Sequence, residues 1–482
     1  MHPRTTNKLT QTRDVYRFGF ESTGALGFDN EYSGLAAEPA HLYCLRRTQT
    51  CMSLLFNLPL WRWVMQTELS QFTAIIGIDW ADKKHDVCIQ AATSGQRQIY
   101  QVPHKVDKLD QWARSLYRQY GGPIAVALEL SKGPIVSVLQ KYDFFVIFPI
   151  DPTTLANHRR TFTPSGAKDD PTDAEYALDL LLKHTEHFKA LNPQSVEMRT
   201  LMTLVEQRRR LMNDRVRITN RIRSTLKQYY PQALEWFDRI DTQLFCDFIK
   251  RWPSLVQAKR ARKTTFEKFF REHNMNRKAL LERRMTAIKS ALPLTEDEAI
   301  ILPYRLQATT LVAQLEVALA SIKIYDDEIA ALAPQHPDYA LFDGLPGAGP
   351  SLAPRLLVAF GEQRERYGKA AELQKYAGIA PVTERSGQST WIHWRWQCPT
   401  FLRQTFVEWS AQTINKSYWA GLYYYQQKAK GCSHQAAVRA LAFKWIRILY
   451  RCWITRTPYD EAKYLKALQR RGSPLLKMAE AA

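Results

Sequence analysis

The sequence predicts a multidomain protein in which an α/β domain precedes a long helical region and a mainly α-helical C-terminal domain. Three observations support this. The chain has 482 residues, more than a single hydrophobic core usually organises. From Thr73 to about residue 190, short apolar runs alternate with helical patterns, as in α/β sheets. Helical periodicity then dominates the rest of the chain.

Composition indicates a polyanionic partner. Lys and Arg total 67 against 47 acidic residues, a formal net charge of +20. Nucleic acid fits this charge better than a membrane surface, because no apolar run approaches the ~20 residues that a bilayer span needs. The seven cysteines are isolated and form no CxxC pair, so neither a zinc site nor a disulfide framework is indicated. We therefore expect the protein to work in the reducing cytoplasm.

Residues 1–70 show no sustained hydrophobic period, and we assign them no fold. Their most apolar stretch, MSLLFNLPLWRWVM, is interrupted by Pro59 and Arg62 and lies too far from Met1 for an ordinary secretion signal. Two explanations stay open. The segment is either a loosely attached extension or the result of a start site assigned upstream of Met65.

The α/β domain, residues 71–190, contains four apolar runs that predict strands. They read TAIIGIDWA (73–81), DVCIQAA (86–92), PIAVALEL (123–130) and FFVIFPI (144–150). The first two are separated by the polar sequence DKKH, which predicts a hairpin. Helices are expected at SKGPIVSVLQKY (131–142) and AEYALDLLLKH (174–184).

A basic helical region follows over residues 195–333. One helix is predicted over 195–230 and a second over about 296–332, and the two can pair as a coiled coil. The polar face of the first helix is rich in arginine, and between Arg199 and Arg223 only Glu206 and Asp214 oppose it. We favour phosphate contact over a merely solvated face. The residues expected to bind nucleic acid there are Arg208, Arg209, Arg215 and Arg223.

The C-terminal domain, residues 334–470, begins with FDGLPGAGPSLAPRLLVAFG (342–361). This segment resembles a hairpin between two helices that presents backbone N–H groups to a phosphate. Gly347 and Gly349 would permit the close approach. A plain Gly/Pro loop is the alternative.

The sequence AKDDPTDAEYAL (167–178) gathers acidic residues in a basic protein. Asp170 can serve as the N-cap of a helix, with Pro171 first in the helix and Asp173 in its acidic first turn. Alternatively, Asp170 and Asp173 share one helix face and can bind a divalent cation. Asp169 is offset by one residue and is expected to face solvent.

Two further acids end predicted strands, Asp79 in IIGIDWA and Glu129 in IAVALEL. Each alone is typical of a surface position. Together with Asp170 and Asp173 they can converge at one edge of a sheet, where two Mg²⁺ ions would offset their repulsion and stabilise charge on a phosphodiester. We interpret Asp79, Glu129, Asp170 and Asp173 as an RNase H-like metal site.

The order GIDW, ALEL, KDDPTDA, YYP, GLPGAGP and KYAGIAPVTERSG resembles the DEDD transposases, or bridge recombinases, of bacterial insertion sequences, the IS110 group. The resemblance covers roughly residues 73–455. It implies a RuvC-like (RNase H-like) fold for the domain that carries the four acids. It also implies a C-terminal serine domain with a helix-hairpin-helix-like element.

Through the same resemblance, Ser386 aligns with the nucleophilic serine of the family, which forms a covalent phosphoserine link to DNA and preserves bond energy for rejoining. Ser389 is the fallback assignment. After Ser386 the chain departs from the family's usual Gly- and Lys-rich run. We expect the serine loop and the acidic site to form one composite centre. Arg403 is a further candidate for phosphate contact.

The resemblance further implies donor and target DNA as substrates, a noncoding bridge RNA as a guide, and homodimers that assemble into tetramers. It places the protein in the bacterial cytoplasm at the nucleoid, with no membrane. Two alternatives stay open. One is a junction-cutting nuclease that uses water, and the other is a non-catalytic nucleic-acid-binding protein.

Overall fold

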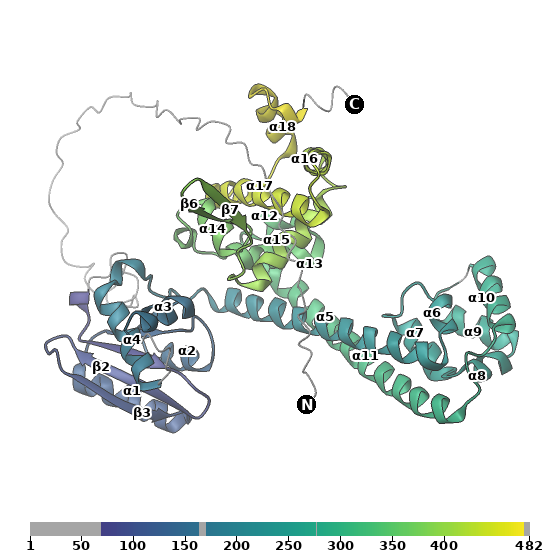
Figure 1. Ribbon diagram of the computed structural model, residues 1–482, viewed down its shortest axis with the longest axis horizontal. Helices are drawn as coiled ribbons and strands as arrows, with labels where there is room; N and C mark the ends of the chain where they lie inside the picture. Colours follow the sequence, from purple (N-terminus) through teal and green to yellow (C-terminus); the bar gives the residue numbers. More distant parts are fainter. Residues whose placement is uncertain (1–68, 163–169, 276, 477–482) are drawn as a thin grey trace, which may run out of the picture. The chain divides into compact units, whose positions relative to one another are not determined.

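The computed structural model describes residues 69–162, 170–275 and 277–476. Apart from Leu69 and Ser70, the predicted N-terminal extension lies outside these residues, as does Asp169. The chain divides between Pro193 and Gln194 into two compact units, which are described separately (Figure 1).

The first unit contains a five-stranded mixed sheet in the order β3-β2-β1-β4-β5. The predicted hairpin is present, with β1 antiparallel to β2, and β1, β4 and β5 run parallel. The sequence did not indicate β3, which pairs antiparallel with β2 at the edge of the sheet and is largely exposed. The strands are β1 (Ala74–Asp79), β2 (Lys84–Ala91), β3 (Arg97–Pro103), β4 (Ile124–Leu128) and β5 (Phe145–Pro149).

Helices cover both faces of this sheet. Leu109 and Trp112 of α1 and Ile135 of α2 pack on the face that carries Ile76 and Val126. On the other face, α3 and α4 pack against Ile75 and Ala125. These helices are α1 (Val106–Tyr120), α2 (Pro134–Leu139), α3 (Pro152–Phe162) and α4 (Asp170–Lys183); short 3₁₀ turns at Leu69–Gln71 and Thr185–His187 flank the domain.

The second unit is built around two long helices, α5 (Val196–Tyr229) and α11 (Glu298–Leu332), which confirm the two helices predicted there. Near its start α5 packs Leu201 against Ile329 of α11, and near its end Leu226 packs with Leu311. The helices are therefore antiparallel neighbours. By length and composition α11 could cross a bilayer, but its buried side lines the contact with α5, as in the core helix of a globular protein.

A helical subdomain is inserted between α5 and α11. Its core is aromatic, and Phe245, Phe248, Trp252, Phe266 and Phe270 are buried together. In Figure 1 the subdomain lies at the end of the α5–α11 pair that is remote from the C-terminal helices. Its helices are α6 (Gln232–Trp236), α7 (Gln243–Arg251), α8 (Leu255–Arg260), α9 (Lys263–Glu272) and α10 (Lys278–Ser290).

The C-terminal part of this unit is mainly α-helical around four buried tryptophans, Trp409, Trp419, Trp445 and Trp453. One two-stranded hairpin, β6 (Val382–Ser386) and β7 (Ser389–His393), interrupts the helices. The helices are α12 (Tyr339–Asp343), α13 (Gly349–Phe360), α14 (Ala370–Tyr376), α15 (Thr400–Thr413), α16 (Tyr418–Ala429), α17 (His434–Thr455) and α18 (Glu461–Arg470); 3₁₀ turns occupy Ala333–Gln335 and Arg364–Arg366.

Candidate active site

The parallel pairing of β1 with β4 brings Asp79 and Glu129 to equivalent positions. Ile78 of β1 is the partner of Leu128 of β4, and each acid is the next residue of its chain. Successive side chains of a strand alternate between the faces. Asp79 therefore shares a face with Ile75 and Gly77, the face covered by α4. Both acids lie half-buried at the carboxyl edge of the sheet.

Gly77 allows α4 to approach this edge. A Cβ atom at Gly77 would lie 2.0 Å from the carbonyl oxygen of Ala174 and 2.7 Å from the amide nitrogen of Leu178. Backbone atoms at such distances cannot yield, so a glycine is required where helix and strand meet. This contact holds the first turn of α4, with Asp170 and Asp173, over β1. The structure thus brings all four predicted acids to one region of one domain.

Asp173 is already engaged by a cation. Its two carboxylate oxygens accept hydrogen bonds from Nε and an Nη of Arg159, both at 2.6 Å. The Asp173 side chain is only 2% exposed. Arg159 lies on α3, directly before the segment that leads into α4. Asp170, in contrast, is exposed at the first position of α4, one residue earlier than the predicted helix start.

Sequence analysis missed Asp86 as well as Arg159. Asp86 of β2 stands directly opposite Asp79 and is 3% exposed, with Gln101 donating a hydrogen bond to it at 2.9 Å. Its place in the run DVCIQAA gave only a strand signal, because the register between two strands is not visible in either strand alone. A third acid therefore lies beside Asp79 and Glu129 at this edge.

The rest of the acidic cluster has a structural role. Arg97 of β3 forms ion pairs with Glu175, at 2.6 Å, and with Asp179. Both acids lie on α4, one helical turn apart, so the arginine ties the edge strand to this helix. Of the acids near Asp170, Glu175 thus helps to dock α4 on the sheet, whereas Asp170 and Asp173 belong to the candidate site.

Carboxylate oxygens suit Mg²⁺, so the donor set fits a hard divalent cation. Asp173 can join such a site only if Arg159 releases it. Among the described residues, three potential ligands with atoms within 4.8 Å of one another occur at His184, Glu186 and His187 instead. These three residues are exposed just after the end of α4. Within the described residues, no three of the four predicted acids come this close together.

Comparison with known proteins identifies this arrangement. Residues 76–231 match a family model for transposases of the DEDD type of IS110, and this match contains all four acids. Residues 339–425 match the model of the IS116/IS110/IS902 transposase family. The chain belongs to the IS110 family of transposases. As a transposase of this family it acts on DNA, and the family's DEDD domain implies an RNase H-like fold, in agreement with the mixed α/β sheet.

Individual relatives agree. The chain is 27% identical over 421 residues to a candidate mini-circle transposase for IS117 of Streptomyces coelicolor, which covers 84% of this chain and 98% of the relative. A candidate transposase of Sinorhizobium fredii, y4uE, is 29% identical over 42% of this chain and 57% of its own. An uncharacterised 43.6 kDa protein of the insertion element IS110 of S. coelicolor is 26% identical over 62% of this chain and 73% of its own.

Ser386 lies in the hairpin, where sequence analysis expected a polar loop. It ends β6 and pairs with Ser389, the first residue of β7, so the two candidate serines face each other across Gly387 and Gln388. Gly387 adopts a φ of 56°, which favours glycine and makes the tight turn possible. Both serines are exposed and, as directly opposite residues, lie on one face of the hairpin.

The same hairpin face carries an ion pair. His393 Nε2 lies 2.7 Å from Glu384 Oε1, and this carboxylate holds the pKa of His393 above its ordinary value. Trp391, the partner of Glu384 across the hairpin, is 58% exposed. The ion pair joins the two strands at the end of the hairpin away from the turn. The turn that carries the two serines is exposed to solvent.

The arginines predicted on α5 differ in their surroundings. Arg208 is paired with Asp326 of α11, Arg209 with Glu408 at 2.7 Å, and Arg215 with Asp241 at 3.6 Å. Arg223 is exposed and donates a hydrogen bond to the side-chain oxygen of Asn220. Three of these four side chains therefore connect α5 to neighbouring elements, which sequence spacing within one helix cannot show.

The glycine turn joins α12 to α13, as predicted, but Gly347 has a packing role. A Cβ atom there would lie 3.1 Å from the backbone oxygen of Gln412 in α15, and its φ is 73°. Gly349 has a φ of 55° and open space around it. The close approach at Gly347 is therefore to another helix, and Gly349 stays the better candidate for contact with a phosphate.

Arg403 belongs to a cationic cluster around Trp394. Its guanidinium lies 5.8 Å from the centroid of the Trp394 ring, and that of Arg439 lies 3.2 Å from it. Burial, with the neighbouring charge of Arg403 in addition, lowers the pKa of Arg439 to about 10. Within the described residues neither guanidinium forms an ion pair with a carboxylate, so this cluster is a candidate anion contact.

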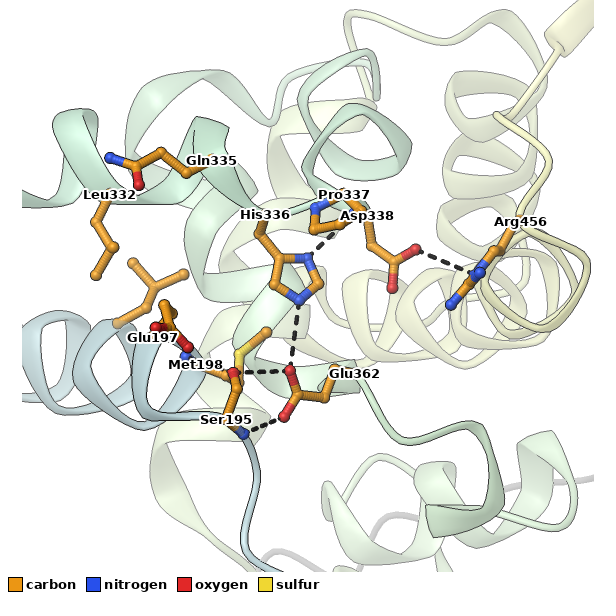
Figure 2. A pocket seen from close by; sticks show the side chains of 11 residues that line it. Ser195, Glu197, Met198, Leu332, Gln335, His336, Pro337, Asp338, Glu362 and Arg456 are labelled. Atoms are coloured by element: carbon orange, nitrogen blue, oxygen red, sulfur yellow. Dashed lines mark hydrogen bonds and ion pairs between the residues drawn. The ribbon is translucent and has the colours of Figure 1, made fainter. Parts of the chain in front are cut away.

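A pocket of about 340 Å³ at the start of α5 is a structural junction (Figure 2). Ser195 caps α5 and donates a hydrogen bond to Glu362 at 2.8 Å, while His336 Nε2 lies 3.8 Å from the same carboxylate. Asp338 pairs with Arg456 at 3.7 Å across the pocket. Neither the four acids nor the candidate serines line it, so we assign it to anchoring α5 on the C-terminal helices.

Proposed function

We propose that this transposase cuts and rejoins donor and target DNA strands through a covalent phosphoserine at Ser386, with Mg²⁺ held by Asp79, Glu129, Asp170 and Asp173. The observation that carries the proposal is the equivalent register of Asp79 and Glu129 on adjacent parallel strands, under the first turn of α4. Two ions at such a site would stabilise the charge that develops on a phosphodiester.

The role of the serine follows from chemistry. The Ser386 oxygen attacks the phosphorus of a DNA phosphodiester, the hydroxyl proton passes to solvent or a base, and the leaving strand departs with a free hydroxyl. The broken phosphodiester bond is replaced by a serine–phosphate bond of similar energy. A DNA hydroxyl can therefore attack the phosphorus, displace the serine and rejoin the strand. The exposed hairpin turn suits this task because DNA can reach it.

Covalent trapping tests the proposal. Element-end DNA is incubated with the protein and Mg²⁺, quenched with denaturant and resolved by gel. Wild type should give a protein–DNA adduct, Ser386→Ala none, and Ser389→Ala should retain it. Because the two serines face each other in one turn, Ser389→Ala is a matched control. Adduct formation by Ser386→Ala but not by Ser389→Ala would move the nucleophile to Ser389.

The same assay separates the alternatives. DNA nicking by Ser386→Ala without any adduct would indicate a nuclease that uses water. Undiminished excision of the element by Asp79→Asn would indicate a protein that binds nucleic acid without catalysis. The acids and Ser386 belong to different units of the chain. Mixing Ser386→Ala with Asp79→Asn protein tests whether the two can be supplied by different copies.

Guidance by a noncoding bridge RNA is part of the proposal. The net charge of +20 suits a protein that binds RNA and DNA together. Protein expressed with its full element should co-purify with one defined RNA, encoded outside the protein-coding sequence. Excision should be lost when that RNA is omitted. We place the protein with the nucleoid of the bacterial cytoplasm.

We also propose a homodimer that assembles into a tetramer. The side of α11 remote from α5 carries an apolar stripe, in which Leu306, Val317 and Ile324 are 58%, 67% and 62% exposed. With 3.6 residues per turn these positions share one side of the helix, which a second copy would cover. Val317→Asp should lower the mass measured by light scattering, whereas Lys323→Asp should not.

A further inference from the structure

The α6–α10 subdomain carries a large excess of positive charge on its helices α8–α10. It lies between the two segments that match family models. From Leu255 to Ser290 the acidic residues are Glu267, Glu272 and Glu282. Against these three stand Lys259, Arg260, Arg262, Lys263, Lys268, Arg271, Arg277, Lys278, Arg283, Arg284 and Lys289.

Some of these cations serve the fold. Lys289 donates hydrogen bonds to backbone oxygens at the end of α8, and Lys259 donates one to Ala291. Arg284 is buried, with its guanidinium 4.9 Å from the centroid of the Phe237 ring. These contacts join α8 to α10 and fix the subdomain as a scaffold.

Lys263 forms an ion pair with Glu267 at 3.9 Å. The other seven cations are exposed. Within the described residues none of them has an ion pair, a hydrogen bond or a ring contact from its side chain. They are Arg260, Arg262, Lys268, Arg271, Arg277, Lys278 and Arg283. On α9, Lys268 and Arg271 are three residues apart, so they share the side opposite the buried Phe266 and Phe269.

Three arginines of α5 show how such cations are paired where they serve the fold. There, Arg208, Arg209 and Arg215 all have carboxylate partners from other elements. A protein surface that keeps seven cations without such partners repels itself, and a polyanion relieves that repulsion. We propose that the exposed cations of α8–α10 form a surface that binds the sugar–phosphate backbone of duplex DNA, independently of sequence, away from the candidate active site. This inference rests on the proposed function, because it assigns the surface to the DNA of that reaction.

Several features favour a duplex backbone as the ligand. The cations come from three consecutive helices and the turns between them. They line neither the pocket at the start of α5 nor the one between α5 and α11. Cations spread over several helices suit the regularly spaced phosphates of a duplex better than a small anion. Exposed aromatic rings, which would stack on single-stranded bases, are absent from the described part of α8–α10, where Phe266, Phe269 and Phe270 are buried.

The test measures affinity for a random-sequence DNA duplex across a series of NaCl concentrations, using the full chain. In the test variant Arg260, Lys268, Arg271 and Arg283 become Gln. In a charge-matched control Lys105, Lys108, Arg118 and Lys141, exposed residues of the α/β domain, become Gln. If all four cations contact phosphates, the slope of log K against log salt should fall by about 3 to 4, and affinity at ~0.1 M salt by roughly 10- to 100-fold. The control should keep the wild-type slope.

Each outcome of this test either supports or overturns the inference. Equal slopes for wild type and the test variant, or equal losses in both variants, would overturn the inference while leaving covalent trapping by Ser386 intact. A loss seen only with duplex RNA of the same length would assign the surface to RNA and overturn the inference for DNA. If wild type neither binds DNA nor forms the adduct, the proposed function fails instead. Thermal melting of the test variant should match wild type, since its four side chains have no partners among the described residues to lose. The control loses only the exposed contacts of Lys108 and Arg118 within α1, so its melting should change little.

Discussion

Arg159 and Asp173 form a bidentate ion pair at the base of the candidate active site, with both oxygens of a carboxylate that is 2% exposed engaged at 2.6 Å. The guanidinium of Arg159 balances the negative charge of the buried Asp173 carboxylate. A divalent cation bound at the proposed site would compete with Arg159 for the same oxygens, so we propose Arg159 as a positioning residue for this acid.

Replacing Arg159 tests this competition. Arg159→Gln leaves a buried carboxylate without its partner, and we expect a loss of about 2–4 kcal/mol in the free energy of unfolding without Mg²⁺. Added Mg²⁺ should raise the melting temperature of this variant more than that of wild type. Arg160→Gln, the exposed neighbour, is the control and should change neither quantity. An identical Mg²⁺ response in wild type and Arg159→Gln would contradict the competition.

Gly77→Ala should displace α4 from β1. The added methyl group meets backbone atoms of Ala174 and Leu178, which cannot move without moving the helix. We expect a loss of about 1–3 kcal/mol in the free energy of unfolding and weaker Mg²⁺ binding, measured by melting and calorimetry. Gly95→Ala has no atom within 4 Å of its new methyl group and should melt like wild type. Normal Mg²⁺ affinity in Gly77→Ala would show that α4 does not position the acids.

Glu408 should be important for stability of the C-terminal helices. It pairs with the buried Arg355 at 2.6 Å and with Arg209 at 2.7 Å. Glu408→Gln removes a carboxylate shared by two cations, so we expect a loss of about 1–3 kcal/mol in the free energy of unfolding. The exposed Glu365 provides the control, Glu365→Gln, which should melt normally. Chemical denaturation measures both variants, and equal stability would contradict the structural role of this network.

Stability of the α/β domain should fall in mild acid because of His85. Burial and the neighbouring His104 lower the pKa of His85 to about 4, although Asp86 opposes the shift. The folded-state pKa lies below the unfolded value near 6.5, so the unfolded chain binds the proton more tightly. The contribution of His85 is thus complete above about pH 6.5 and is lost as pH falls toward 4, up to about 2–3 kcal/mol. His85→Gln should flatten urea-unfolding stability across this range; an unchanged pH profile would contradict the assignment.

Much of the fold follows from local sequence. The apolar runs at residues 74–79, 124–128 and 145–149 are strands, and the two long periodic segments are α5 and α11. The amphipathic α1 and the edge strand β3 were not predicted. β3 is largely exposed, so it lacks the apolar run that marks a buried strand. The serine turn was read as a loop because polar residues do not distinguish a two-residue hairpin from an irregular connection.

The amino-acid sequence by itself determined which residues are available for chemistry: acids at strand ends, an acidic helix start, a serine before a glycine, and a large excess of cations. The tertiary structure alone decided their surroundings. Strand register placed Asp86 opposite Asp79, and the close contact at Gly77 placed α4 over the sheet. Packing between helices gave partners to Arg208 and Arg209, whereas Arg271 has none among the described residues. The reason is physical: hydrophobic periodicity acts within one element, whereas pairing of charges depends on distances between elements.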